Sequence, residues 1–366
     1  MKKLLIVGNM KSSSLRNLIQ KAFLECDLEI YVLPMDIESF KEEFESERIH
    51  MLPIRRKSNK MLYYFQLIHY LRKNEFDYIN IQYVEPVFLP LIYMKKNKGT
   101  KVIATYWGSD LMVINPIVLK CIAPFVYRFD YVTFDSMDLR KIFNDIYSKY
   151  DSKKQVMTWI GSDILQILTR YEIEDENRVA RKEWNISLDK CVISIGYNGG
   201  DRQQHIKVLE QIDILSRNMK DQICIILQLT GNSSANYIDE VRKKAESLGT
   251  QLLIFDDWLD NSEIARIRVV SDVFINAQIT DAFALSVGEH LYAKTVLVTA
   301  DWLNYLELQN GDFDYLIFRD FDEIPDIVTR IITQGVNIDR EKNRRNIYNY
   351  RSWEQTNEAW KNVFDI

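Results

Sequence analysis

Apolar and polar positions alternate in two ways along the first half of the chain. Short apolar runs that predict strands lie within residues 3–8, 28–34, 77–84, 100–110, 130–136 and 154–163. Residues 15–24 and 59–74 carry apolar side chains at the three- and four-residue spacing of an amphipathic helix. Strands that alternate with helices predict parallel βαβ units.

The same pattern starts again after the charged stretch at residues 170–184. Strands are predicted within residues 190–200, 222–231, 250–259, 272–278 and 294–300. Helices are predicted at residues 205–218, 237–249 and 262–271. We therefore expect an α/β protein whose two Rossmann-like domains face each other across a cleft. The expected domains are residues 1–168 and 169–347, followed by an amphipathic helix within 348–366.

Composition agrees with this organisation and excludes several classes of protein. A chain of 366 residues with 47% hydrophobic residues can form two domains with full cores. Its net charge of -5 disfavours nucleic-acid binding. No apolar run reaches the length of a membrane span, and the 4 cysteines and 4 histidines form no CxxC pair or metal-binding cluster. We expect a cytoplasmic protein that uses no metal or other cofactor.

Ligands of doubly wound sheets bind in the loops that follow strands. In the loop at residues 196–205, Gly199 and Gly200 permit a tight turn with exposed amides. Arg202 adds a charge that can bind phosphate oxygens. These residues predict a diphosphate-binding loop, although a simple strand-to-helix turn explains them equally well.

A second candidate is the sequence DAFALSVGE at residues 281–289. Asp281 should follow a strand, and Glu289 should lie about 2.2 helical turns later on nearly the same face. Carboxylates accept hydrogen bonds from hydroxyl groups of a ligand, and amides at the start of a helix suit a phosphate. The amides concerned belong to Ala282, Phe283, Ala284 and Leu285. The alternative is an N-cap aspartate followed by an exposed glutamate.

The third candidate is the sequence YWGSD at residues 106–110. Gly108 allows a ligand to approach closely, and Trp107 can stack on a sugar ring. Asp110 can act as a base or accept a hydrogen bond from a hydroxyl group. The alternative is a capping motif with Trp107 in the core.

In this order, the loops resemble those of the GT-B glycosyltransferases, and within them the retaining group called family 4. DAFALSVGE matches the spacing of the family's E-x7-E motif, with Asp281 and Glu289 at its two acids. YWGSDL resembles the HGxD loop, and WIGSD resembles the NGVD loop. YRSWEQTNEAWKNVF is similar to the C-terminal helix that crosses back to the N-terminal domain. Asp281 stands where the family usually has a glutamate. The chain also departs from the family pattern at four other positions, Trp107, Tyr197, Ala282 and Ala284.

The resemblance implies a hexosyltransferase of class EC 2.4. It would move a sugar from a UDP-, GDP- or dTDP-sugar to a glycan or lipid-linked acceptor, with retention of configuration. Its catalytic residues would be Asp110, Asp281 and Glu289, with Asp281 binding the donor sugar and Glu289 the ribose. The diphosphate would be bound, without a metal, by Gly199, Gly200, Arg202 and the amides of residues 282–285. The acceptor side would include Gly8, Trp107, Gly108 and Asp110.

Two basic clusters in the N-terminal half predict contact with an anionic membrane surface. They contain Arg55, Arg56, Lys57, Lys60, Lys95 and Lys96. Because the family often uses membrane-bound acceptors, we expect a peripheral protein on the cytoplasmic face of the inner membrane. Its pathway would be the assembly of a bacterial surface polysaccharide such as lipopolysaccharide, O-antigen or capsule. The alternative is that each cluster is a solvated helix face.

Two other functions stay open at this point. A non-catalytic GT-B-like subunit would bind and stabilise a partner transferase, and the substitutions at Trp107, Ala282 and Ala284 favour it. A nucleotide-sugar epimerase shares the fold, but the chain offers no identifiable acid and base for both faces of a sugar.

Overall fold

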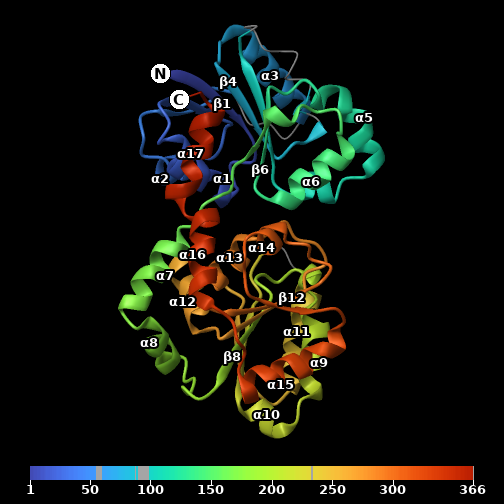
Figure 1. The fold of residues 1–366 in the computed structure, drawn as a ribbon. Helices are drawn as coiled ribbons and strands as arrows, with labels where there is room; N and C mark the ends of the chain where they lie inside the picture. Colours follow the sequence, from blue (N-terminus) through green and yellow to red (C-terminus); the bar gives the residue numbers. More distant parts are fainter. Residues whose placement is uncertain (55–59, 87, 90–98, 232–233, 366) are drawn as a thin grey trace. The chain divides into compact units, whose positions relative to one another are not determined.

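The structure is a computed structural model that describes residues 1–54, 60–86, 88–89, 99–231 and 234–365 (Figure 1). The chain divides into two compact units, each built on one parallel sheet. Unit 1 comprises Met1–Gly161 and Trp353–Ile366, and unit 2 comprises Ser162–Ser352.

Within the described residues, unit 1 has a 7-stranded sheet in the order β3-β2-β1-β4-β5-β6-β7. Its strands are β1 (Lys2–Val7), β2 (Leu28–Val32), β3 (Ile49–Met51), β4 (Tyr78–Gln82), β5 (Lys101–Tyr106), β6 (Tyr131–Phe134) and β7 (Gln155–Met157). Its helical elements are α1 (Ser13–Leu18), η1 (Ile19–Phe23), α2 (Ile37–Glu43), α3 (Lys60–Lys73), α4 (Ser109–Met112), α5 (Pro116–Val126), α6 (Met137–Ile146), η3 (Ser152–Lys154) and α17 (Trp353–Val363). The described strand pairings are parallel, as the alternation of strands and helices predicted.

The described part of unit 2 has a 6-stranded sheet in the order β10-β9-β8-β11-β12-β13. Its strands are β8 (Cys191–Ile195), β9 (Ile223–Gln228), β10 (Gln251–Phe255), β11 (Val273–Asn276), β12 (Val296–Ala300) and β13 (Leu316–Phe318). Its helical elements are α7 (Ile164–Ile173), α8 (Glu176–Glu183), η4 (Asp201–Gln203), α9 (His205–Ile214), α10 (Arg217–Asp221), α11 (Ala235–Ser247), α12 (Asn261–Val270), α13 (Leu285–Tyr292), α14 (Leu306–Asn310), η5 (Phe321–Glu323), α15 (Ile324–Gln334) and α16 (Arg340–Arg351). The second Rossmann-like sheet expected from the sequence is therefore confirmed.

The chain passes from one unit to the other between residues 161 and 162 and again between 352 and 353. We expected these passages after residues 168 and 347. The difference arises because α7 packs Leu165 and Leu168 into the core of unit 2, so the unit begins before this helix. The last helix, α17, returns to unit 1, where the ring of Trp360 packs edge-on at 4.8 Å from that of Phe23. The predicted return of the C-terminal helix is thus confirmed.

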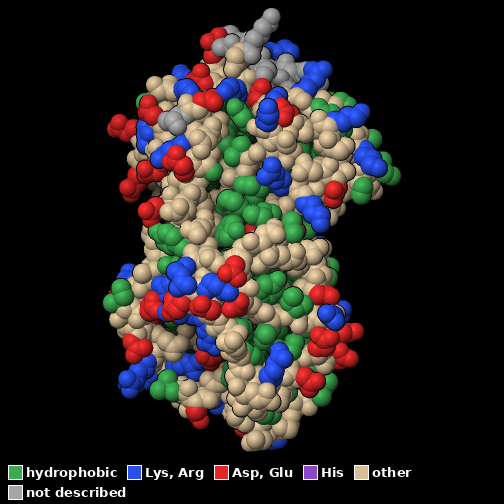
Figure 2. All heavy atoms as spheres, in the orientation of Figure 1, with side chains coloured by type: hydrophobic (Ala, Val, Ile, Leu, Met, Phe, Trp, Pro, Cys, Tyr) green, Lys and Arg blue, Asp and Glu red, His purple; other side chains and the backbone are tan. Residues whose placement is uncertain are grey.

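Ion pairs join helices on the surface of unit 2. Lys294, just after α13, pairs with Glu172 of α7 and Glu341 of α16, and Arg344 of α16 also pairs with Glu172. Figure 2 shows these opposite charges gathered near α16. Exposed pairs of this kind contribute little stability each, so the apolar core carries most of the stability of the unit.

The predicted basic clusters fall largely on the part of the chain that is not described. Arg55, Arg56, Lys57, Lys95 and Lys96 lie outside the described residues, as does the side chain of Lys60. Among the helices that are described, none combines the length and apolar character that crossing a bilayer requires.

Acidification should destabilise unit 2 through His205, the first residue of α9, whose side chain is fully buried. Burial lowers the pKa of His205 to about 4, whereas an unfolded histidine titrates near its ordinary value of 6.5. Below pH 6.5 the unfolded chain therefore binds a proton that the folded chain does not bind. We expect the free energy of unfolding to fall by about 2 kcal/mol between pH 7 and pH 5 from this residue alone.

Urea unfolding at the two pH values tests this expectation. A His205→Gln variant should lose about 2 kcal/mol less than the wild type on acidification. The control is His69→Gln, because His69 is exposed on α3. An equal loss in the wild type and in His205→Gln would contradict the assignment.

Candidate functional site

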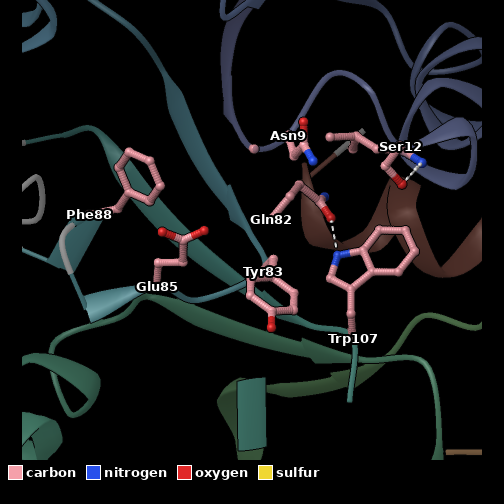
Figure 3. Close-up of a pocket in the computed structure, with 9 residues that line it drawn as sticks. Asn9, Ser12, Gln82, Tyr83, Glu85, Phe88 and Trp107 are labelled. Atoms are coloured by element: carbon pink, nitrogen blue, oxygen red, sulfur yellow. Dashed lines mark hydrogen bonds between the residues drawn. The ribbon is translucent and has the colours of Figure 1, made fainter. Parts of the chain in front are cut away.

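A pocket of about 260 Å³ opens in unit 1 where β1, β4 and β5 end (Figure 3). Its small and polar lining residues are Gly8, Asn9, Ser12, Gln82 and Glu85. Its apolar and aromatic lining residues are Leu15, Tyr83, Phe88 and Trp107. The structure therefore brings together Gly8 and Trp107, two residues that the sequence placed on the acceptor side.

Gly8 is required because the loop after β1 passes very close to β4. A Cβ atom on Gly8 would lie 2.9 Å from the Cβ of Gln82 and 2.9 Å from a methyl carbon of Leu15. Such contacts are shorter than close packing allows. Ser12 then starts α1, and its hydroxyl group accepts a hydrogen bond from the amide of Leu15 at 3.4 Å. The two features fix one wall of the pocket.

Asp110 connects the two pocket loops that follow β4 and β5. Its side chain is fully buried, and its carboxylate accepts hydrogen bonds from the amides of Val84, Trp107 and Gly108 at 2.9–3.3 Å. Burial raises the pKa of Asp110, and the three amides oppose that rise. The geometry gives this residue a structural role, and the base role expected for it stays a prediction that the geometry does not support.

Trp107 lines the pocket with its indole ring, which contradicts the alternative of a core position. Its Nε1–H group donates to the Oε1 atom of Gln82 at 2.8 Å, so the plane of the ring is fixed. Gly108 has φ 131°, a conformation that favours glycine. Gly108 therefore shapes the turn behind Trp107 rather than the wall of the pocket.

The end of β4 and the loop that follows it were not identified from the sequence as part of the site; they contribute Gln82, Tyr83 and Glu85 to the pocket. Tyr83 has φ 65°, which is rare for a bulky side chain, and its hydroxyl oxygen lies 3.0 Å from the Oγ of Ser109. The rule that ligands bind after parallel strands, applied to the strand at 77–84, identifies this loop.

In unit 2, the glycine loop between β8 and α9 uses its amides internally. The amide of Gly199 donates to the carbonyl oxygen of Thr230 at 2.8 Å, and that of Gly200 donates to Oδ1 of Asn198 at 2.9 Å. These are amides that we expected to face a diphosphate. The simple-turn interpretation accounts for both, and their role as phosphate ligands stays a prediction.

Arg202 lies in the same loop and is exposed. Its guanidinium group donates to the hydroxyl group of Thr280, and its carbonyl oxygen accepts from the amide of Ile279 at 2.9 Å. The structure thus brings Arg202 against the loop that precedes Asp281, as a common binding site for a diphosphate requires.

Asp281 caps its own loop. Its carboxylate accepts from the amide of Ala282 at 2.8 Å, from the amide of Ala284 at 3.3 Å, and from the hydroxyl group of Tyr305 at 2.6 Å. Burial raises the pKa of Asp281, while Tyr305 and the two amides lower it. Tyr305 was not identified from the sequence, because no local pattern links it to a residue 24 positions away.

Phe283 places its side chain in the core, and the role of its amide as a phosphate ligand stays a prediction. Its side chain is fully buried, and its carbonyl oxygen accepts from the guanidinium group of Arg351, the last residue of α16. Leu285 begins α13 after the N-cap residue Ala284. The amide of Leu285 is therefore among those that a helix leaves without an intrahelical acceptor. Of the four amides that we expected to bind phosphate, this one best keeps the geometry for it.

Glu289 is buried, which contradicts the alternative of an exposed glutamate. Its Oε2 atom lies 3.3 Å from Nε of Arg268, and its Oε1 atom accepts from the hydroxyl group of Ser162 at 2.9 Å. Arg268 also donates to Gln228 at 3.2 Å. Burial lowers the pKa of Arg268, and Glu289 beside it raises that pKa. Both oxygens of Glu289 have protein partners, so its ribose role stays a prediction.

Removing Glu289 should destabilise unit 2 strongly, because Arg268 would be left buried without a counter-charge. We expect Glu289→Ala to lower the free energy of unfolding by about 3–5 kcal/mol, measured by urea unfolding. The matched control is Glu240→Ala, an exposed glutamate on α11, with an expected change of about 0.5 kcal/mol or less.

A double variant separates the ion pair from other effects of the substitution. Replacing both Arg268 and Glu289 by methionine removes the pair without leaving a lone charge. The double variant should therefore be more stable than Glu289→Ala. The ion-pair interpretation fails if Glu289→Ala behaves like Glu240→Ala.

Comparisons with known proteins agree with this architecture. Residues 3–136 match a family model described as Glycosyl transferase 4-like. A glycosyltransferase from Rickettsia africae ESF-5 is similar in structure, with a TM-score of 0.77, 14% identity, and 99% of this chain and 97% of that chain covered. No curated protein is similar enough in sequence to match this chain.

Two further solved structures extend the comparison. Anabaena Alr3699/HepE in complex with UDP and glucose has a TM-score of 0.73 at 13% identity, with 100% of both chains covered. Sucrose-phosphate synthase (tll1590) from Thermosynechococcus elongatus has a TM-score of 0.72 at 11% identity, with 100% of this chain and 98% of that chain covered. At these identities the likeness shows the fold. The whole chain therefore has the GT-B fold of these structures, and its residues 3–136 match the model described as Glycosyl transferase 4-like.

Proposed function

We propose that the chain is a glycosyltransferase that moves a sugar from a nucleotide-sugar donor to a glycan or lipid-linked acceptor. The observation that carries this proposal is the meeting of Arg202 with the loop at 278–284, next to the N-terminal end of α13. A cation beside the amide of Leu285 at the start of a helix suits a diphosphate, which gains negative charge as the glycosidic bond breaks. The similarity to HepE, whose structures contain UDP and UDP-glucose, supports a uridine nucleotide as donor.

In this proposal, Asp281 binds the donor sugar. Each of its oxygens accepts one or two hydrogen bonds from the protein, and a carboxylate has about four acceptor positions. Its half-buried side chain keeps room for a sugar hydroxyl group. Glu289 acts through structure instead, because its ion pair with Arg268 holds α13 against α12.

The acceptor binds to unit 1, in the pocket between Gly8 and Trp107. The resemblance of DAFALSVGE to the E-x7-E motif supports retention of configuration at the transferred sugar. The family's use of membrane-bound acceptors supports a lipid-linked acceptor, peripheral membrane contact, and a pathway of bacterial surface polysaccharide assembly.

Nucleotide binding is the first test of the donor site. The melting temperature should be measured with UDP, UDP-glucose, GDP and dTDP. A ligand present at 100 times its dissociation constant stabilises by about 2.7 kcal/mol, which raises the melting temperature by roughly 2–4 °C or more. We expect this rise with one nucleotide family in the wild type and its loss in Arg202→Ala.

The matched control for Arg202→Ala is Arg330→Ala, an exposed arginine on α15 that should leave the rise unchanged. Glu289→Ala is unsuitable for this purpose because it breaks a buried ion pair. If no nucleotide raises the melting temperature, the transferase proposal fails. Binding without sugar transfer to any acceptor would instead favour a non-catalytic subunit.

A further inference from the structure

The pocket of unit 1 has the chemistry of a carbohydrate site without a phosphate-binding group. Asn9, Ser12 and Gln82 offer amide and hydroxyl groups, while Tyr83 and Trp107 offer aromatic rings (Figure 3). Among the described residues that line the pocket, none is Lys, Arg or His. The charged group that lines it is a carboxylate, from Glu85.

The nearby cation on α1 is already neutralised. Arg16 follows Leu15, which lines the pocket, but its Nη2 atom lies 2.9 Å from a carboxylate oxygen of Glu43. Its Nη1 atom donates to the carbonyl oxygen of Met10 at 3.1 Å. The guanidinium group is therefore held by the protein and directed to these acceptors.

Trp107 is held by a chain of buried hydrogen bonds that runs through the sheet. Its indole N–H donates to Gln82, whose Nε2 group donates to Oδ1 of Asn80. Asn80 donates in turn to Oγ1 of Thr105 at 3.0 Å, and Thr133 donates to the same atom at 2.8 Å. Buried polar side chains in neighbouring strands are costly unless they are satisfied in this way. This series of hydrogen bonds ends at the ring of Trp107 and fixes its orientation at the pocket wall.

The loop after β4 holds Tyr83 in an unfavourable backbone conformation. A non-glycine residue at φ 65° costs on the order of 1–3 kcal/mol and persists where surrounding contacts impose it. Here the following amide, of Val84, donates to Asp110 at 3.0 Å, and the hydroxyl group of Tyr83 lies 3.0 Å from Ser109. The aromatic walls of the pocket are therefore built in advance of a ligand.

On these observations, and resting on the proposed function, we propose that the pocket binds an uncharged glycosyl residue of the acceptor. The apolar face of the sugar stacks on Trp107, and its hydroxyl groups bond with Asn9 and Glu85. Gln82 is a positioning residue for the ring of Trp107. Glu85 discriminates against acceptors that carry a phosphate on this sugar, because like charges repel at short range.

The test observes Trp107 directly and needs no donor. The protein is labelled with 5-fluorotryptophan, which gives a ¹⁹F signal for each of the 7 tryptophans. Trp107→Phe assigns the signal of interest, and Gln82→Leu assigns it independently because it removes the hydrogen bond to the indole. The probes are methyl glycosides of glucose, galactose, mannose and N-acetylglucosamine, each paired with its 6-phosphate.

We expect at least one neutral glycoside to shift the Trp107 signal in a saturable way, and its 6-phosphate to bind roughly tenfold more weakly. Glu85→Gln should remove most of that difference. Glu47→Gln, at an exposed glutamate before β3, should leave it unchanged. Gln82→Leu should move the signal of the free protein and also weaken the glycoside.

Three results would overturn the proposal: no neutral glycoside affects Trp107, a 6-phosphate binds at least as well as its parent, or Glu85→Gln leaves the difference intact. The outcome is separate from that of the nucleotide test. Saturable glycoside binding without a nucleotide effect would support the pocket assignment while the transferase proposal fails. Transfer to a phosphorylated sugar would support the transferase proposal while the assignment of the pocket to an uncharged sugar fails.

Discussion

The carboxylate of Asp110 is the point on which the pocket of unit 1 depends. It is buried, and it gathers the amides of Val84, Trp107 and Gly108 from two loops that follow neighbouring strands. Parallel strands end at one edge of a sheet, and the loops beyond them lose the regular pairing of the ladder. The two oxygens of one carboxyl group satisfy several of these amides at once. They thereby fix Trp107 and the loop of Tyr83 relative to each other.

Unit 2 uses a buried acid in a comparable way. Glu289 joins Arg268 of α12 and Ser162, the first residue of the unit, to α13. In the two units, these buried acids stabilise loops and helices near the ends of the parallel strands. The groups that we propose to bind a ligand are less buried: the indole ring of Trp107, the exposed Arg202 and the half-buried Asp281. A motif acid is therefore not a ligand-binding group merely because of its position in the motif.

The sequence predicted the fold well because periodicity reports burial directly. Largely apolar runs identified interior strands of both sheets, such as β4 and β9, which are buried on both faces. The three-residue strands β3 and β13 are too short to show a period and were not predicted, whereas β7, of the same length, was predicted because it lies in a longer apolar run at 154–163. The domain boundaries differ from the expected ones because α7 and α16 pack their apolar faces into the core of unit 2. The spacing of apolar residues shows that each helix has such a face, but it does not show which unit the face packs against.

By itself, the sequence determined two parallel sheets and the loops that follow their strands. These follow from local periodicity and from the direction that parallel strands share. Only the tertiary structure decided which carboxylates are buried and what they hold. The contacts of a carboxylate depend on partners far away in the sequence, such as Tyr305 for Asp281 and Ser162 for Glu289. No local pattern records such partners, because the solvation of a charge is set by everything packed around it.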